Sequence, residues 1–141
     1  MINKLLTYLK FGNHFCGVEH TTINDKDCIY TTILGKKKKE LQIKRTNETD
    51  TIEANSAFIG KDKHVSLVIN NNQVITKVVK SEQTNATQLV HKAFPNISLE
   101  DFYFEKISNQ NKHFISICRK NYIEDLIEAY KKLQRFYKKI N

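Results

Sequence analysis

Residues 64–80 read HVSLVINNNQVITKVVK, two β-branched apolar runs on either side of three asparagines. Val65, Leu67 and Ile69 alternate along the first run and therefore share one face of an extended strand. Val68 points to the opposite face, and a strand with apolar residues on both faces is typical of the centre of a sheet. Because asparagine tolerates the positive φ angles of a tight reversal, this stretch predicts a hairpin whose first strand is central.

Upstream of this stretch, three segments have the β-branched and aromatic content of strands. They are residues 14–20 (HFCGVEH), 28–34 (CIYTTIL) and 40–45 (ELQIKR). Residues 51–59 (TIEANSAFI) have a weak helical period and predict a short helix over the sheet. Residues 2–10 carry apolar side chains at helical spacing, which fits either a helix or the start of a strand pairing.

Downstream, the pattern changes to helix, hairpin and helix. Residues 86–94 predict a helix that Pro95 ends. Residues 101–107 and 113–118 predict two strands joined by a polar turn. The last helix begins near Asn121 and keeps one apolar stripe to the C-terminus, with acidic residues early and lysines late, as the helix dipole favours.

The 141-residue chain is long enough for one domain or two small lobes. We expect a mixed α+β (α/β) protein with a meandering sheet in residues 1–73 and a second motif, a strand followed by helix, hairpin and helix (αββα-type), in residues 74–141. Its apolar runs are far shorter than the roughly 20 residues that cross a bilayer. The N-terminus also lacks the pattern of a signal peptide, so we expect a soluble, cytoplasmic protein.

The three cysteines, Cys16, Cys28 and Cys118, are odd in number, widely spaced and set in apolar or strand-like contexts. We expect buried, reduced thiols, which fit a cytoplasmic location. None of the five histidines forms an HxxxH pair, and the sequence has no CxxC pair. The sequence therefore predicts no metal site.

The formal net charge of +8 has two interpretations. It fits an acidic partner such as nucleic acid or anionic lipid. It also fits the drift of an AT-rich genome, because lysine, asparagine and isoleucine are all abundant. The most visible basic run is Lys36, Lys37, Lys38 and Lys39. We expect it to be a solvated hairpin turn that deters edge pairing, with a phosphate-binding patch as the alternative.

No motif of a known catalytic chemistry is present. The sequence lacks a GxxxxGK[ST] loop, a GxGxxG turn, a GxSxG elbow and an HExxH helix. Glu19 and His20 stand together at the end of the first predicted strand, but neighbours in a strand point to opposite faces and cannot easily act together. For Phe102, Tyr103 and Phe104 we expect core packing, with base stacking as the alternative. The sequence therefore predicts no enzyme.

The order of these elements resembles the first half of the actin-like (ribonuclease H-like) ATPase fold. It is similar in particular to the cytoplasmic PilM and GspL proteins of type IV pilus and type II secretion assembly. The resemblance implies that HFCGVEH opens subdomain 1A and that residues 74–140 match a small inserted subdomain, 1C. The family's first phosphate loop carries Asp-x-Gly, whereas Glu19 and His20 stand near the matching positions here. We therefore expect no ATP and no other cofactor.

The resemblance implies a non-catalytic adaptor or scaffold in the cytoplasm. Its partner would be the short cytoplasmic segment of an inner-membrane assembly protein or a secretion motor ATPase, and that partner could hold it peripherally at the inner membrane. An open sheet edge offers unpaired amides to such a segment, and we expect the docking edge at Cys28, Tyr30, Thr32 and Leu34. The alternative is a small basic nucleic-acid-binding protein that uses the lysine run at residues 36–39.

Overall fold

The computed structural model describes residues 14–60 and 63–140, so the segment 2–10 lies outside the described residues. It is a mixed α+β protein, as expected, and forms two compact units. The first unit comprises the described residues up to Asn71 and the last helix from Glu128, and the second comprises Asn72–Ile127. The sequence had suggested a division at residues 73 and 74 with the whole last helix in the second region. The structure instead divides that helix between the units.

The first unit contains a four-stranded sheet, which we call sheet A. Its strands are β1 (His14–Ile23), β2 (Lys26–Lys37), β3 (Glu40–Thr49) and β4 (His64–Asn70), in the order β3-β2-β1-β4. The first three strands form an antiparallel meander, and β4 pairs parallel to β1. The three predicted upstream strands are thus confirmed, and each is longer than its apolar pattern indicated.

The predicted hairpin at residues 64–80 is wrong. Among the described strands, β4 lies at an edge of sheet A, and β5 (Ile75–Lys80) pairs with another sheet. Val65, Leu67 and Ile69 do share one face, but Val68 is 54% exposed on the other, so the second face is not buried. The asparagines join two units, and the tight turns with positive φ occur at the hairpin tips.

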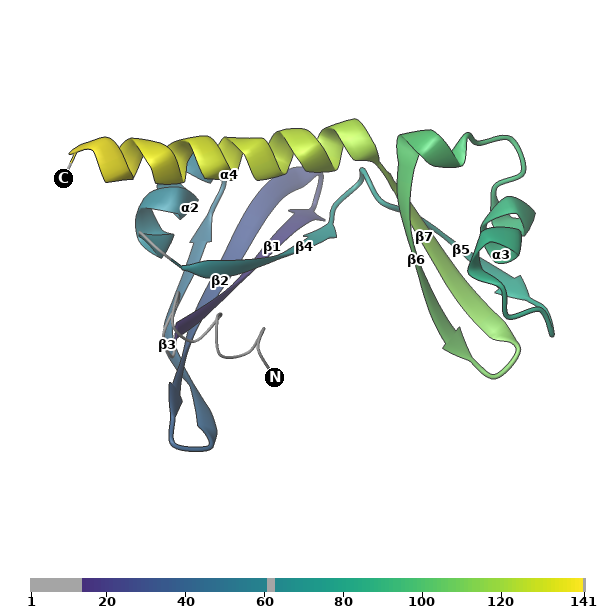
Figure 1. Ribbon diagram of the computed structural model, residues 1–141, viewed down its shortest axis with the longest axis horizontal. Coiled ribbons are helices and arrows are strands. Elements are labelled where there is room, and N and C mark those ends of the chain that lie inside the picture. Colours follow the sequence, from purple (N-terminus) through teal and green to yellow (C-terminus); the bar gives the residue numbers. More distant parts are fainter. Residues whose placement is uncertain (1–13, 61–62, 141) are drawn as a thin grey trace. The chain divides into compact units, whose positions relative to one another are not determined.

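Two helices lie on one face of sheet A, as Figure 1 shows for α2 (Ile52–Ile59). Thr51 caps α2, because its hydroxyl accepts from the Ala54 amide at 3.3 Å. The second is the C-terminal part of α4 (Lys120–Ile140), which follows the last strand directly. The side chains buried on this face alternate along β1 and β2, and the register puts them opposite one another: Cys16, Val18, His20, Ile29, Thr31 and Ile33.

Buried hydrogen bonds join both helices to sheet A. The Tyr130 hydroxyl in α4 lies 2.8 Å from His20 Nε2 and accepts from Asn55 Nδ2 in α2 at 3.0 Å. The side-chain oxygen of Asn55, Oδ1, in turn accepts from the Thr31 hydroxyl at 2.5 Å. All four side chains are buried or nearly so. This chain fixes which face of sheet A the helices cover.

The second unit contains a three-stranded antiparallel sheet, which we call sheet B, in the order β5-β7-β6. The predicted hairpin is confirmed as β6 (Phe102–Asn109) and β7 (Lys112–Arg119), and the predicted helix as α3 (Ala86–Ala93). A single 3-10 turn, η1 (Leu99–Asp101), precedes β6. One face of sheet B packs against α3 through an apolar cluster: Val79, Leu89, Val90, Ala93, Phe94, Ile115 and Ile117.

Candidate protein-binding face

The other face of sheet A carries the residues that the sequence singled out for partner binding. Cys28, Tyr30, Thr32 and Leu34 alternate along β2 with the buried residues of the covered face, and each is partly exposed. Within residues 14–60 and 63–140, the helices that pack on sheet A do so through the opposite face. We call this surface the uncovered face of sheet A.

The predicted docking edge is not an edge. Strand β2 lies between β1 and β3, and Thr32 is paired with Gly17 on one side and Thr46 on the other. Its backbone groups therefore belong to two ladders and cannot receive an added strand. The sequence failed here because the apolar pattern of residues 28–34 defines a strand without giving its neighbours. Any contact through these residues must use their side chains.

The register arranges those side chains in rows across the strands. Phe15, Leu34 and Ile43 form an apolar row on β1, β2 and β3. The side chains of the neighbouring row are small, since it runs from Gly17 through Thr32 to Thr46, and a Cβ built at Gly17 would meet no atom within 4 Å. There is thus open space above the centre of the face, beside a row of large apolar side chains.

A bulge in the β2–β3 pairing completes the apolar row. The register shifts between Ile33, which pairs with Arg45, and Leu34, which pairs with Ile43. The extra residue, Lys44, interrupts the alternation on β3, so Ile43 stands on the uncovered face with Leu34 and is 68% exposed. Without the shift, Lys44 would occupy that place. Ile43 was missed in the sequence, where only the alternation of ELQIKR pointed to it.

Among the described residues, the polar side chains Cys28, Tyr30 and Glu48 of this face do not include an activated nucleophile. Cys28 Sγ donates to Glu48 Oε1 at 3.4 Å, and Tyr30 lies opposite Glu48. Desolvation raises the pKa of the Cys28 thiol, and the hydrogen bond with Cys28 raises the pKa of Tyr30. Burial raises the pKa of Cys16 to about 11 and that of Cys118 above its usual value. All three cysteines are therefore thiols at neutral pH, and the thiolate is the reactive form.

Glu19 and His20 do not form a functional pair. Strand β1 continues to Ile23, so both residues lie inside the strand and not in the loop after it. His20 is buried beneath Tyr130, and burial lowers its pKa. Glu19 is on the opposite face, where it accepts from Asn70 Nδ2 at 3.3 Å. The loop after the first strand is the turn at Asn24 and Asp25, both with positive φ, so the expected phosphate-loop match was misplaced.

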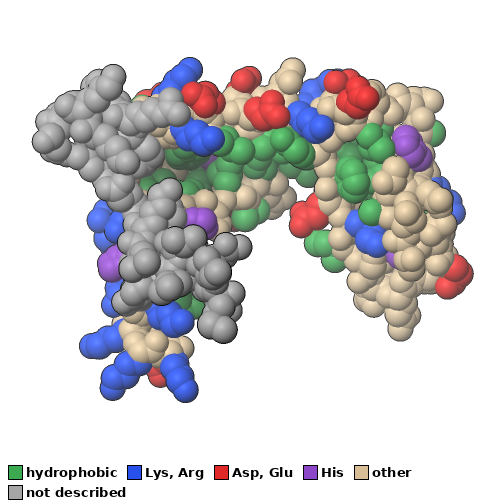
Figure 2. Space-filling model, in the orientation of Figure 1, with side chains coloured by type: hydrophobic (Ala, Val, Ile, Leu, Met, Phe, Trp, Pro, Cys, Tyr) green, Lys and Arg blue, Asp and Glu red, His purple; other side chains and the backbone are tan. Residues whose placement is uncertain are grey.

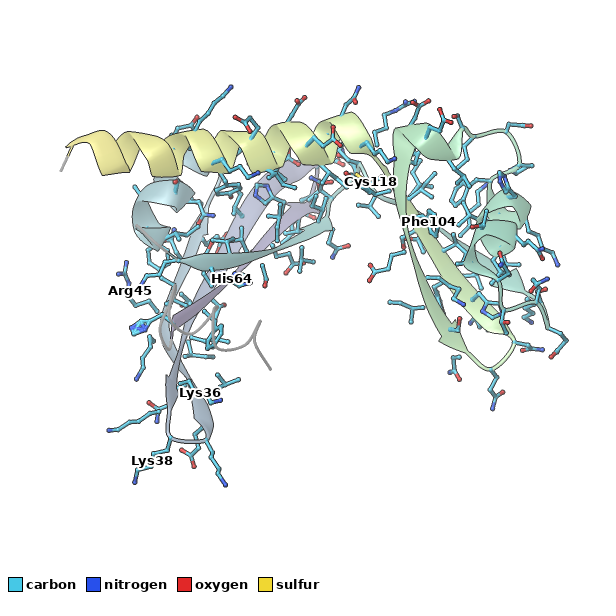
Figure 3. The ribbon with its side chains drawn as sticks, viewed as in Figure 1. Lys36, Lys38, Arg45, His64, Phe104 and Cys118 are labelled. Atoms are coloured by element: carbon cyan, nitrogen blue, oxygen red, sulfur yellow. The ribbon has the colours of Figure 1, made fainter. Side chains whose placement is uncertain are left out.

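The lysine run forms the tip of the β2–β3 hairpin, as predicted. Lys36 to Lys39 are all exposed, and Lys38 has φ +57° in the turn. Figure 2 shows the basic side chains gathered at this tip, and Figure 3 shows Lys36 and Lys38 there. Lys37, Lys38, Lys39, Glu40 and Gln42 line a shallow hollow of about 580 Å³.

The aromatic run in β6 divides between two environments. Phe102 packs against the apolar cluster of the second unit, as expected. Tyr103 is 44% exposed, and its hydroxyl donates to Glu124 at 3.1 Å. Phe104 is 39% exposed and carries a label in Figure 3. Core packing therefore accounts for Phe102 alone. In the described part of the chain, no group of three or more His, Cys, Asp or Glu side chains could hold a metal ion.

The comparisons with known proteins show a likeness in structure and none in sequence. No protein-family model and no curated protein matches this sequence. The structure is similar to the cytoplasmic domain of EpsL, an inner-membrane component of the type II secretion system of Vibrio cholerae, with a TM-score of 0.57 and 11% identity. The match covers 85% of this chain and 53% of that chain, so this chain spans about half the length of its structural neighbour. Among the described residues, no helix has the length and apolar character needed to cross a membrane. The likeness confirms the mixed α+β fold class and is consistent with half of an actin-like fold.

Proposed function

We propose that this chain is a non-catalytic adaptor domain of a secretion- or pilus-type assembly platform, and that it binds a protein partner through the uncovered face of sheet A. One observation carries the proposal: a row of large apolar side chains on a sheet face beside open space. Ile43 is 68% exposed and Leu41, opposite Lys36, is 62% exposed. Exposed apolar groups that gather in this way mark interaction surfaces.

The apolar row can supply the binding energy. Phe15 and Leu34 are half-buried and already held by neighbouring strands, so ordering them on binding costs little entropy. Complete burial of one large apolar side chain contributes roughly 1.5–3 kcal/mol. Three such residues in one row therefore form an anchor of the kind that dominates protein interfaces.

The proposed partner follows from the fold. The structural neighbour is part of an inner-membrane component of a secretion system. The resemblance to PilM and GspL points to the short cytoplasmic segment of an inner-membrane assembly protein, or to a secretion motor ATPase. Either partner would hold the chain in the cytoplasm at the inner membrane. The partner would lie across the strands of sheet A, because β2 has no free edge.

Absence of catalysis is part of the proposal. His20 is buried and hydrogen-bonded to Tyr130, and the three thiols have pKa values above their usual range. The turn after β1 is Asn24 and Asp25, with no glycine to let a phosphate approach the backbone. We expect titration calorimetry with ATP and magnesium to show no submillimolar affinity. Binding in that range would contradict the non-catalytic assignment.

The experiment that tests the proposal measures binding of the candidate segments to the immobilised full chain. The segments are the cytoplasmic parts of inner-membrane assembly proteins and of a secretion motor ATPase. We expect one of them to bind, and Ile43→Ser to weaken its binding by about tenfold, because an anchor side chain is lost. Ile75→Ser is the matched control, since Ile75 is 52% exposed in the second unit.

Two results would contradict the proposal. In one, no segment binds. In the other, a segment binds the Ile43→Ser chain and a folded Leu34→Ser chain as tightly as it binds the unchanged chain. Leu34 is the cross-strand neighbour of Ile43. Circular dichroism on each variant separates loss of binding from loss of structure.

A further inference from the structure

Sheet B has an uncovered face of its own, which the proposed function does not use. The register aligns Val78, Phe114 and Ile107 in one row across β5, β7 and β6. Val78 is 50% exposed and Ile107 is 63% exposed. Strand residues alternate in direction, so this row lies on the face opposite the one that holds Ile115. We call it the apolar row of sheet B.

This row is not needed for the core of the second unit. The opposite face is already closed by α3, with Leu89, Val90 and Ile115 fully buried. The second face of an antiparallel sheet is commonly solvated and polar, as the neighbouring rows Thr76/Ser116/Glu105 and Lys80/Lys112/Asn109 are here. The row of three apolar residues departs from that pattern. The apolar row therefore lacks a covering layer within the described part of the second unit.

Lysines stand at both ends of this face. Lys80 and Lys112 are direct cross-strand neighbours in the row beyond Val78 and Phe114, and like charges in that position are destabilising. Lys112 Nζ lies 5.2 Å from the centre of the Phe114 ring. At the other end, Lys120 Nζ lies 5.4 Å from the centre of the Tyr103 ring. Glu124 accepts from the Tyr103 hydroxyl at this second end, so the uncompensated positive charge lies at Lys80 and Lys112, where an anionic group would relieve the repulsion.

We infer that this face docks an amphipathic helix of a partner protein, with an apolar stripe that covers the apolar row and acidic residues that reach the lysines. The dimensions fit, because β5 and β6 are two strand spacings apart, about 10 Å, and a helix with its side chains is about 10–12 Å wide. The opposite face already packs against one helix, α3, in the same way.

Other occupants fit the face less well. A second copy of the chain would bring lysines against lysines, and the net charge of +8 opposes such an approach. A nucleic acid strand stacks its bases on aromatic rings, whereas Val78 and Ile107, the most exposed side chains of the row, are aliphatic.

The test uses a synthetic probe and the full chain. The probe is a fluorescein-labelled helical peptide of about 14 residues, or four turns, with leucines at i, i+3, i+4 and i+7 and glutamates on the remaining surface. Fluorescence anisotropy should show saturable binding in the micromolar range. Ile107→Ser should weaken it by about tenfold, as expected for a lost apolar anchor. A double change, Lys80→Ser with Lys112→Ser, should also weaken binding relative to the unchanged chain, and this loss of affinity should be larger at low salt than at high salt.

The chain provides a close control. Ile75 lies on the same strand as Val78 with nearly the same exposure, 52% against 50%, but on the face that packs against α3. Val78→Ser should weaken binding and Ile75→Ser should not. A peptide with lysine in place of glutamate, and a scrambled peptide of the same composition, should not bind. All of these side chains except Phe114 are exposed, so the variants should remain folded.

The inference is overturned if the glutamate peptide does not bind, if Ile75→Ser and Val78→Ser have equal effects, or if the lysine peptide binds as well. A single-stranded oligonucleotide of about 16 nucleotides that binds more tightly than the peptide, and loses affinity with Ile107→Ser, would assign the face to nucleic acid instead. A dimer in sedimentation that Ile107→Ser dissociates would assign it to self-association. The outcome does not depend on the uncovered face of sheet A, because Ile43→Ser should leave peptide binding unchanged.

Discussion

The two units hold a helix against a sheet by different means. In the second unit, α3 packs against sheet B chiefly through apolar side chains, with Leu89 and Val90 fully buried, and one hydrogen bond joins Lys77 Nζ in β5 to the Ala93 carbonyl oxygen at 3.1 Å. In the first unit, α2 and α4 meet sheet A at a chain of buried polar groups that passes through the Tyr130 hydroxyl. Apolar burial contributes most of the free energy of folding but has no direction. A satisfied polar chain contributes less net free energy and specifies one arrangement.

The largest expected effect is in the apolar attachment. Leu89→Ala should lower the free energy of unfolding of the second unit by about 2–5 kcal/mol, because a fully buried side chain leaves a cavity against Ile115. Hydrogen exchange read amide by amide should show the loss in α3 and β7. Val68→Ala, at a 54% exposed position in sheet A, is the control and should change stability by less than about 0.5 kcal/mol. Equal protection of α3 in both variants would show that the cluster does not hold the helix.

The polar attachment should be less costly to break. Tyr130→Phe keeps the ring but removes the hydroxyl, which leaves Asn55 Nδ2 and His20 Nε2 without this partner in a buried place. We expect a loss of about 1–3 kcal/mol, the usual cost of an unsatisfied buried polar group, with faster exchange in α2. Tyr103→Phe is the matched control, since its hydroxyl bonds to Glu124 at the surface. A control that loses as much as Tyr130→Phe would mean that the buried chain has no special role.

The difference between the units also explains what could be predicted from the sequence. The attachment of α3 follows from local pattern, since Leu89, Val90, Ala93 and Phe94 recur at helical spacing and Pro95 ends the segment. The polar chain joins residues that are distant in sequence, because Tyr130 is 75 positions from Asn55 and 110 from His20. No single-sequence pattern connects them.

The candidate site shows the same limit. The β-branched and aromatic content of residues 28–34 predicted a strand, which the structure confirms, but strand order depends on non-local pairing, so the docking edge at Cys28, Tyr30, Thr32 and Leu34 was wrong. The stretch at residues 64–80 failed for the same reason. Its two runs join different sheets, and an apolar run alone does not identify its neighbours. The bulge that exposes Ile43 depends on the register between two strands, which the sequence does not state.

A smaller effect should appear in the pH dependence of the free energy of unfolding of the first unit. Burial lowers the pKa of His20 below its ordinary value of 6.5, although Asp27 acts in the opposite direction. The unfolded chain therefore takes up a proton near pH 6.5 that the folded first unit resists, so protonation favours unfolding. The stability that neutral His20 provides should be full above about pH 6.5 and decline as the pH falls below it. His20→Asn should flatten this part of the pH profile, measured by denaturant unfolding between pH 5 and 8. An unchanged slope in the variant would assign the dependence to other groups.

The smallest effect on stability should come from the lysines at the hairpin tip. The same variant tests whether the first unit binds nucleic acid. Lys36 to Lys39 are exposed and form the tip of the hairpin, so replacing all four with serine should change the free energy of unfolding by less than about 0.5 kcal/mol. Each phosphate that a lysine neutralises adds about −0.9 to the slope of log affinity against log salt on duplex DNA. Four flexible lysines should therefore give weak binding without sequence preference, which is nearly lost at physiological salt. The double change Lys80→Ser with Lys112→Ser provides the comparison in the second unit, where these lysines flank the apolar row of sheet B. If the tip variant abolishes a submicromolar affinity for DNA or RNA at physiological salt while the double change leaves it intact, the first unit is a nucleic-acid-binding domain and the adaptor proposal fails. If both variants reduce only weak binding at low salt, the lysines act as a general positive charge, and the specific contacts of each unit belong to its apolar row.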